Sequence, residues 1–155
     1  MKLSIETVRK EVTVNASEEK AFRVFTEEFN SWWPGDHKIG KSAMSKAILE
    51  PKANGRWYEV GEDGSECDWG KGLIWRPYST FTLAWQLNRL WQYDPSFMTE
   101  VEVTFTALGA NRTRVSLEHR DIERFGAAAT EIKNAFESDE GWTGLLRSFA
   151  VVAGT

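Results

Sequence analysis

The stretch 99–119, TEVEVTFTALGANRTRVSLEH, consists of two segments of alternating apolar and polar residues separated by a turn at Gly109-Ala110-Asn111. Side chains that alternate with a period of two are typical of a β-strand with one buried face. The stretch therefore predicts an antiparallel hairpin. Its apolar face carries, in chain order, Thr99, Val101, Val103 and Phe105, then Val115, Leu117 and His119.

The same period recurs upstream and predicts about five further strands, at residues 4–15, 45–50, 56–60, 69–75 and 81–87. Asn54-Gly55 and the stretch 61–64, GEDG, are turn signals between them. Strict alternation in 69–75 places Trp69, Lys71, Leu73 and Trp75 on one side of that strand. The glycines between these residues usually mark a bend or a close backbone approach.

Helical spacing appears near both ends of the chain. Ser17 is a candidate N-cap for a helix that continues to about Phe29. A second helix is expected over 124–136, and a third from Ser138-Asp139-Glu140. The apolar row of the third helix is Trp142, Leu145, Leu146, Phe149 and Val152. Gly141 and Gly144 near its start allow close approach to a neighbouring segment.

Successive antiparallel strands with helices gathered on one face predict an α+β fold in a single domain, residues 1–155. Each strand offers one apolar row and the last helix is apolar on one side. Both are buried together when a curved antiparallel sheet wraps around the C-terminal helix. Because a curved sheet and a straight helix do not match everywhere, we expect a cavity between them.

Composition narrows the functional classes. A net charge of −4 over 155 residues argues against a nucleic-acid footprint, and no apolar run approaches membrane-spanning length. The N-terminal residues alternate and do not resemble a secretory signal. The single cysteine, Cys67, fits a reducing cytoplasm and has no metal-ligand spacing around it. The two histidines lie far apart in sequence with no cysteine or aspartate cluster, so no metal site is expected. No cofactor is expected either. Eight tryptophans are unusual and suggest a roomy core or a lined cavity.

An ordered set of short motifs resembles a known family. The motifs are Trp32-Trp33-Pro34, His37, Ile39-Gly40, Gly55-Arg56-Trp57-Tyr58-Glu59, Asp63-Gly64, Trp69-Gly70, Thr99-Glu100-Val101, Glu118-His119, Gly141-Trp142 and Leu145-Leu146. Together they resemble the Bet v 1-like or START-like (SRPBCC) superfamily, in the bacterial branch named after the activator of Hsp90 ATPase. The chain departs from relatives at 76–79, where they often carry two prolines. The resemblance implies the helix-grip fold with an apolar cavity, in a family that includes lipid carriers and polyketide cyclases.

His119 is the most interesting polar residue, because the alternation points its ring inward. It can orient a ligand or act as a general base. The alternative is a buried ring satisfied by a backbone carbonyl or a carboxylate. The candidate ligand-binding residues are Arg56, Tyr58, Trp69, Trp75, Trp85, His119 and Trp142. Glu59 is a further candidate. The resemblance implies that the loop of His37 lies near the opening of the cavity, which makes His37 a candidate lid residue; the alternative is a solvated loop histidine.

Three functions are compatible with these residues. The first is binding of a small apolar or aromatic ligand between sheet and helix, which the thin polar content of the inward positions favours. The second is a cyclase or hydratase that uses His119, Tyr58 or Glu59 as acid or base. The third is a protein-interaction domain, with a protein partner or a homodimer, for which an exposed Trp32-Trp33 pair is the candidate surface.

Overall fold

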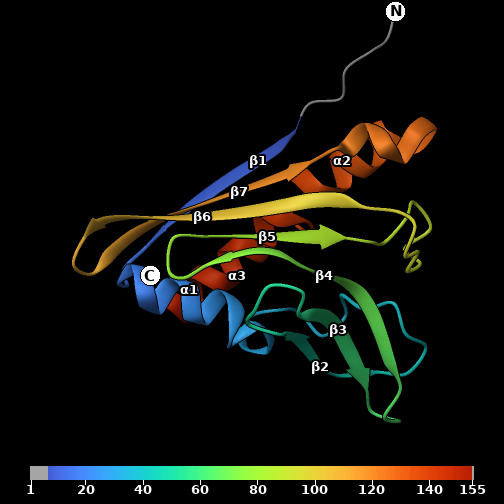
Figure 1. Ribbon diagram of the computed structural model, residues 1–155, viewed down its shortest axis with the longest axis horizontal. Coiled ribbons are helices and arrows are strands. Elements are labelled where there is room, and N and C mark those ends of the chain that lie inside the picture. The colour runs from blue at the N-terminus through green and yellow to red at the C-terminus, as the bar shows by residue number, and fades with distance from the viewer. Residues whose placement is uncertain (1–6, 155) are drawn as a thin grey trace, which may run out of the picture.

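The computed structural model describes residues 7–154, and its main element is one antiparallel sheet of seven strands in the order β1-β7-β6-β5-β4-β3-β2 (Figure 1). The sheet curls into a half-barrel. Residues 4–6 of the first predicted strand lie outside the described part. The strands are β1 (Val8–Val14), β2 (Met44–Leu49), β3 (Arg56–Gly61), β4 (Glu66–Arg76), β5 (Thr80–Trp85), β6 (Thr99–Gly109) and β7 (Arg112–Arg120).

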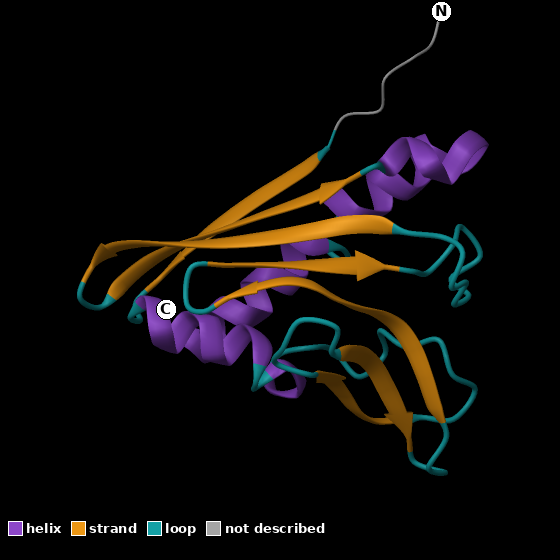
Figure 2. Ribbon diagram, viewed as in Figure 1, coloured by secondary structure: helices purple, strands orange, loops and turns teal. Residues whose placement is uncertain are grey.

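The helices gather on one side of this sheet, as Figure 2 shows. They are α1 (Glu18–Thr26), the short 3₁₀ helices η1 (Phe29–Ser31) and η2 (Ile122–Ala128), α2 (Ala129–Glu137) and α3 (Trp142–Ala153). Helix α3 crosses the sheet behind β5 and β6 in Figure 1 and contacts β1 and α1. This arrangement confirms the predicted α+β helix-grip fold. No helix among residues 7–154 has the length and apolarity needed to cross a bilayer.

The hairpin predicted from residues 99–119 is confirmed by the register of β6 and β7. Val101 lies opposite His119, Val103 opposite Leu117, and Phe105 opposite Val115. These side chains are all buried, with exposed fractions of 3% or less. On the two neighbouring strands Val8 lies opposite His119 and Leu83 opposite Val101, so His119 sits in the middle of an inward row.

Two β-bulges overturn strict alternation in β4. The register shifts between Trp57 and Tyr58 on one side of β4 and between Gly72 and Ile74 on the other. The prediction that Lys71 shares a side with Trp69 and Trp75 is therefore wrong: Lys71 is exposed, whereas Trp69 is buried. A bulge adds one unpaired residue to a strand, which resets the faces of all residues beyond it.

The predicted start of the last helix is also wrong. The Ser138 hydroxyl donates to the Ala135 carbonyl and ends α2, and α3 begins only at Trp142. The close approach expected at the glycines is confirmed, because a Cβ on Gly144 would overlap the carbonyl oxygen of Asp139. The chain thus turns sharply over residues 138–141, the segment we call the α2–α3 junction.

Two smaller details of the helices differ from the predictions. Ser17 caps α1 as expected and accepts a hydrogen bond from the Lys20 amide at 3.1 Å, but α1 ends at Thr26 and Phe29 begins a separate 3₁₀ turn. The last predicted inward residue of α3, Val152, is 38% exposed, and Ala153 is buried in its place.

Candidate functional site

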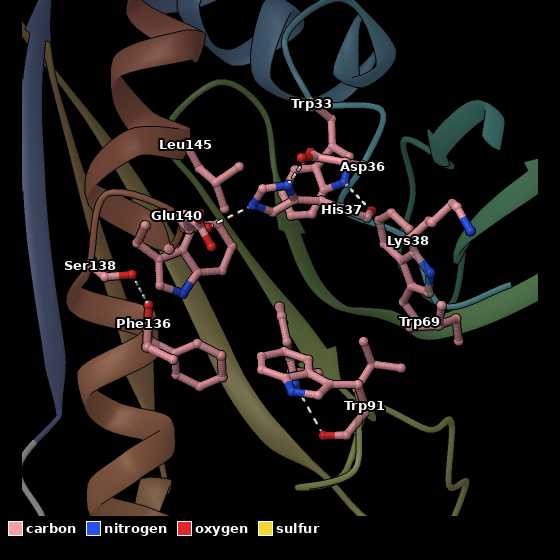
Figure 3. Close-up of a pocket in the computed structure, with 16 residues that line it drawn as sticks. Trp33, Asp36, His37, Lys38, Trp69, Trp91, Phe136, Ser138, Glu140 and Leu145 are labelled. Atoms are coloured by element: carbon pink, nitrogen blue, oxygen red, sulfur yellow. Dashed lines mark hydrogen bonds and ion pairs between the residues drawn. The ribbon is translucent and has the colours of Figure 1, made fainter. Parts of the chain in front are cut away.

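A cavity of about 320 Å³ lies between the sheet and the C-terminal helices (Figure 3). Its volume is at the lower end of the range for small-molecule sites. Its walls are mostly aromatic and aliphatic, and its polar residues lie on exposed or half-buried segments at one rim. The lining residues are Trp33, Asp36, His37, Lys38, Ile39, Trp69, Trp85, Leu87, Trp91, Ala135, Phe136, Ser138, Glu140, Gly141, Trp142 and Leu145.

Five of the eight tryptophans line this cavity, and each comes from a different segment: Trp33, Trp69, Trp85, Trp91 and Trp142. Their rings form a connected wall. The ring centroids of Trp33 and Trp69 are 5.4 Å apart, and those of Trp85 and Trp142 are 6.1 Å apart. Indole faces present a large, rigid, apolar surface with a negative electrostatic face, which suits a flat aromatic guest.

The pair Trp32-Trp33 folds inward, so the idea that it forms an exposed contact surface is wrong. The two side chains are 3% and 8% exposed. The Trp32 indole N–H donates to the Val24 carbonyl at 3.1 Å, and that of Trp33 donates to the His37 carbonyl at 2.9 Å. Because each indole N–H has a hydrogen-bond acceptor, burial of these rings leaves no donor unpaired and carries no penalty for one.

Glu59 on β3 is a buried carboxylate that holds the cavity wall in place. It is 1% exposed and accepts from the backbone amides of Ile39 at 2.6 Å and Gly40 at 3.3 Å. It also accepts from the Trp69 indole N–H at 2.9 Å. Two of these donors, Ile39 and Trp69, line the cavity, so Glu59 fixes the wall from behind and does not face the cavity itself.

Trp91 comes from the loop between β5 and β6, which the alternation pattern did not include. The Asn88 side chain accepts from the amides of Leu90 at 2.9 Å and Gln92 at 3.2 Å, and this turn places Trp91 at a positive φ of 59°. The Trp91 ring meets Trp85 and Phe136 edge to face. An asparagine that bonds to the backbone ahead of it is the available sequence signal for such a turn.

His119 is fully buried behind the cavity wall and is absent from its lining. The Trp142 indole N–H donates to Nδ1 at 3.1 Å, so Nδ1 carries no proton. The other nitrogen, Nε2, then carries the proton and donates to the Thr99 hydroxyl at 2.8 Å. Burial lowers the pKa of His119 to about 3. The ring stacks on Phe136 with 4.3 Å between the two ring centroids. His119 therefore supports the wall as a neutral ring with both nitrogens hydrogen-bonded.

The structure brings together only some of the predicted ligand-binding residues. Trp69, Trp85 and Trp142 line the cavity. Arg56 instead pairs with Asp68 at 3.0 Å and lies over the Tyr58 ring at 3.8 Å, on the half-exposed side of the sheet. Trp75 meets Phe22 and Phe81 in a separate part of the core.

The rim of the cavity carries His37, which the family resemblance placed near the opening. His37 Nδ1 lies 2.9 Å from the Asp36 carboxylate, and Nε2 lies 2.7 Å from the carbonyl oxygen of Glu140. The hydrogen bond to His37 holds the pKa of Asp36 below its ordinary value. The His37 side chain is 27% exposed, so this contact borders solvent and the cavity at once.

Other chemistries find little support among residues 7–154. This part of the chain contains no cluster of three or more histidine, cysteine or acidic side chains arranged to hold a metal ion. Burial, followed by the negative charge of Glu59, raises the pKa of the Cys67 thiol. A thiol of raised pKa is a weak nucleophile near neutral pH.

A curled antiparallel sheet around a C-terminal helix, with a cavity between them, defines the helix-grip class. Residues 15–154 match the family described as activator of Hsp90 ATPase homolog 1-like protein. The chain belongs to this family. A comparison with curated proteins gives no match.

Three solved structures place the chain within this class. An anthrahydroquino-gamma-pyrone synthase, Txn09, is 37% identical with a TM-score of 0.68, over 96% of this chain and 97% of its own. CalC, a self-sacrificing resistance protein from Micromonospora echinospora, is 34% identical with a TM-score of 0.70, over 95% and 93%. The Aha1 dimer from Colwellia psychrerythraea is 14% identical over 96% of both chains, with a TM-score of 0.63, and shares the fold.

Proposed function

We propose that this protein binds a flat aromatic small molecule in the cavity between its sheet and its C-terminal helices. The observation that carries the proposal is the wall of five tryptophans around about 320 Å³. Aromatic rings stack on or meet one another edge to face with a gain of about 0.5–1.5 kcal/mol per pair beyond the burial of their area. A guest of two or three fused rings satisfies several such contacts at once.

The polar residues support a binding role more directly than a catalytic one. His119 is neutral, sealed and hydrogen-bonded through both ring nitrogens, so it has no free position from which to exchange a proton with a guest. Glu59 is occupied by three N–H donors. The polar groups that reach the cavity lie at the rim, where they can orient one end of a ligand.

Catalysis on the bound ligand is the second candidate function, favoured by the synthase that is 37% identical to this chain. The 34% identical relative is described as a resistance protein. Sequence similarity alone therefore does not distinguish catalysis on a ligand from sequestration of that ligand. His37 is the candidate acid or base for such a reaction, because it lines the cavity and its side chain is 27% exposed, whereas His119 is sealed.

A fluorescence titration tests the binding proposal. Flavone and unsubstituted anthraquinone are added to the protein and to two variants, Trp91→Ala and Trp75→Ala. We expect quenching of tryptophan emission by the wild type and about tenfold weaker binding by Trp91→Ala, since a lost aromatic wall costs about 1.4 kcal/mol. Trp75 lies outside the cavity lining, so its variant is expected to keep the wild-type affinity. Absence of binding, or equal losses in both variants, contradicts the proposal.

A further inference from the structure

His37 lies between two oxygen atoms that can only accept hydrogen bonds. Its Nδ1 is 2.9 Å from the carboxylate of Asp36, and its Nε2 is 2.7 Å from the backbone carbonyl oxygen of Glu140 (Figure 3). A neutral imidazole has one N–H donor and one acceptor nitrogen, whereas the protonated ring donates from both nitrogens. The two contacts are therefore satisfied together only when His37 carries a positive charge.

These contacts join the two sides of the cavity rim. Asp36 and His37 belong to the loop that follows η1, and Glu140 belongs to the α2–α3 junction. All three residues line the cavity. The backbone carbonyl of His37 also accepts from the Trp33 indole N–H at 2.9 Å, so the position of the ring is coupled to that of a wall residue. A change in the protonation of Nε2 therefore alters the contact between the loop and the α2–α3 junction.

We propose that His37 is a proton-controlled latch on the aromatic cavity, an inference that rests on the proposed function. The protonated ring ties the loop to the α2–α3 junction and slows passage of the ligand. Loss of one proton breaks one tie and frees the rim.

The bond that breaks is the one to Glu140. A single remaining proton is held best at Nδ1, because the acceptor there is an ionised carboxylate and such hydrogen bonds are about twice as strong as neutral ones. The Nε2 lone pair then points at the Glu140 carbonyl oxygen from 2.7 Å, and two acceptors at that distance repel each other. The loop and the junction separate as a result.

Other charged groups also lie on the segments around the ring. They are Asp36 and Lys38 on the loop, Glu59 on β3, Asp139 and Glu140 in the α2–α3 junction, and Arg147 on α3. Arg147 pairs with Asp139. Histidine is the side chain whose charge ordinarily changes near neutral pH. The second histidine, His119, stays neutral there because its pKa is about 3.

Two measurements between about pH 5.5 and 8.5 test the latch, since this is the range in which imidazole ordinarily titrates. The first is NMR of the ¹⁵N-labelled protein, in which the two histidine rings are separately visible. We expect His37 to be protonated on both nitrogens at the acidic end and to lose the Nε2 proton on titration. The indole N–H of Trp33 and the amide of Gly141 should shift with the same midpoint, while His119 stays in its Nε2–H form.

The second measurement is the association rate of flavone, which has no ionisable group, by stopped-flow quenching. Loss of one hydrogen bond of about 1 kcal/mol predicts a rate about five times higher at the alkaline end. His37→Gln should remove this dependence. The control variant Lys41→Gln, at an exposed residue of the same loop outside the cavity lining, should keep it.

The latch is wrong if His37 loses the Nδ1 proton first, or if Trp33 and Gly141 do not follow its titration. A pH-dependent rate that persists in His37→Gln also overturns it. Failure of flavone to bind at any pH counts against the proposed function instead, and the NMR titration then decides on the latch by itself.

Discussion

Acid should destabilise this protein through His119, and the magnitude follows from its burial. Burial lowers the pKa of His119 in the folded state to about 3, against 6.5 for the free side chain. Between these values the unfolded chain binds a proton that the folded chain does not. The free energy of unfolding therefore falls by about 1.4 kcal/mol for each pH unit below the unfolded pKa, and nothing is lost above it. At about pH 4.5 the loss amounts to roughly 3 kcal/mol.

Urea unfolding followed by tryptophan fluorescence measures this loss. The reference is His119→Gln, which keeps an amide able to donate and accept but removes the titration. His37 is present in both proteins, so its contribution cancels in the difference. Between about pH 7 and pH 4.5 the wild type should lose roughly 3 kcal/mol more than the variant. Parallel stability curves for the two proteins would refute the assignment of a buried neutral ring.

Two further predictions concern stability. Glu59→Gln should lower the free energy of unfolding by about 2–4 kcal/mol, since an amide NH₂ replaces one oxygen that accepts from buried N–H groups. Urea unfolding checks this, with the exposed Glu62→Gln as a control expected within about 0.5 kcal/mol of wild type. Gly144→Ala should cost about 1–3 kcal/mol although alanine is the better helix former, because its Cβ meets the Asp139 carbonyl. Gly109→Ala has open space around it and should be neutral in thermal unfolding.

Sequence periodicity was sufficient wherever a strand pairs regularly. Strands β5, β6 and β7 follow the expected alternation, because each inward residue lies opposite another inward residue across the sheet. It failed in β4, where bulges add residues that a fixed period cannot anticipate. The start of the last helix was predicted too early, at residue 138. Ser138 donates to a carbonyl of the preceding helix instead of capping the following one.

The presence of an aromatic cavity was predictable from the sequence, but only some of its lining residues were. Trp69, Trp85 and Trp142 lie on regular elements, so their direction follows from the element. Trp33 and Trp91 come from loops, where direction depends on local turns and on partners distant in sequence. The tryptophan-rich composition therefore indicated a cavity, but it did not indicate which loop residues complete the cavity wall.

The two histidines show why residue type and burial pattern do not settle a role. Both rings have two hydrogen-bonded nitrogens, but their partners differ in kind. His119 faces one donor, the Trp142 indole, and one hydroxyl that can accept, so a neutral ring satisfies both. His37 faces a carboxylate and a carbonyl, so only a charged ring satisfies both. The strand alternation drew attention to His119 because it points inward, yet the inward ring is sealed against exchange. The ring at the rim depends on its proton to hold two segments together, and it is the one that can respond to conditions outside the protein.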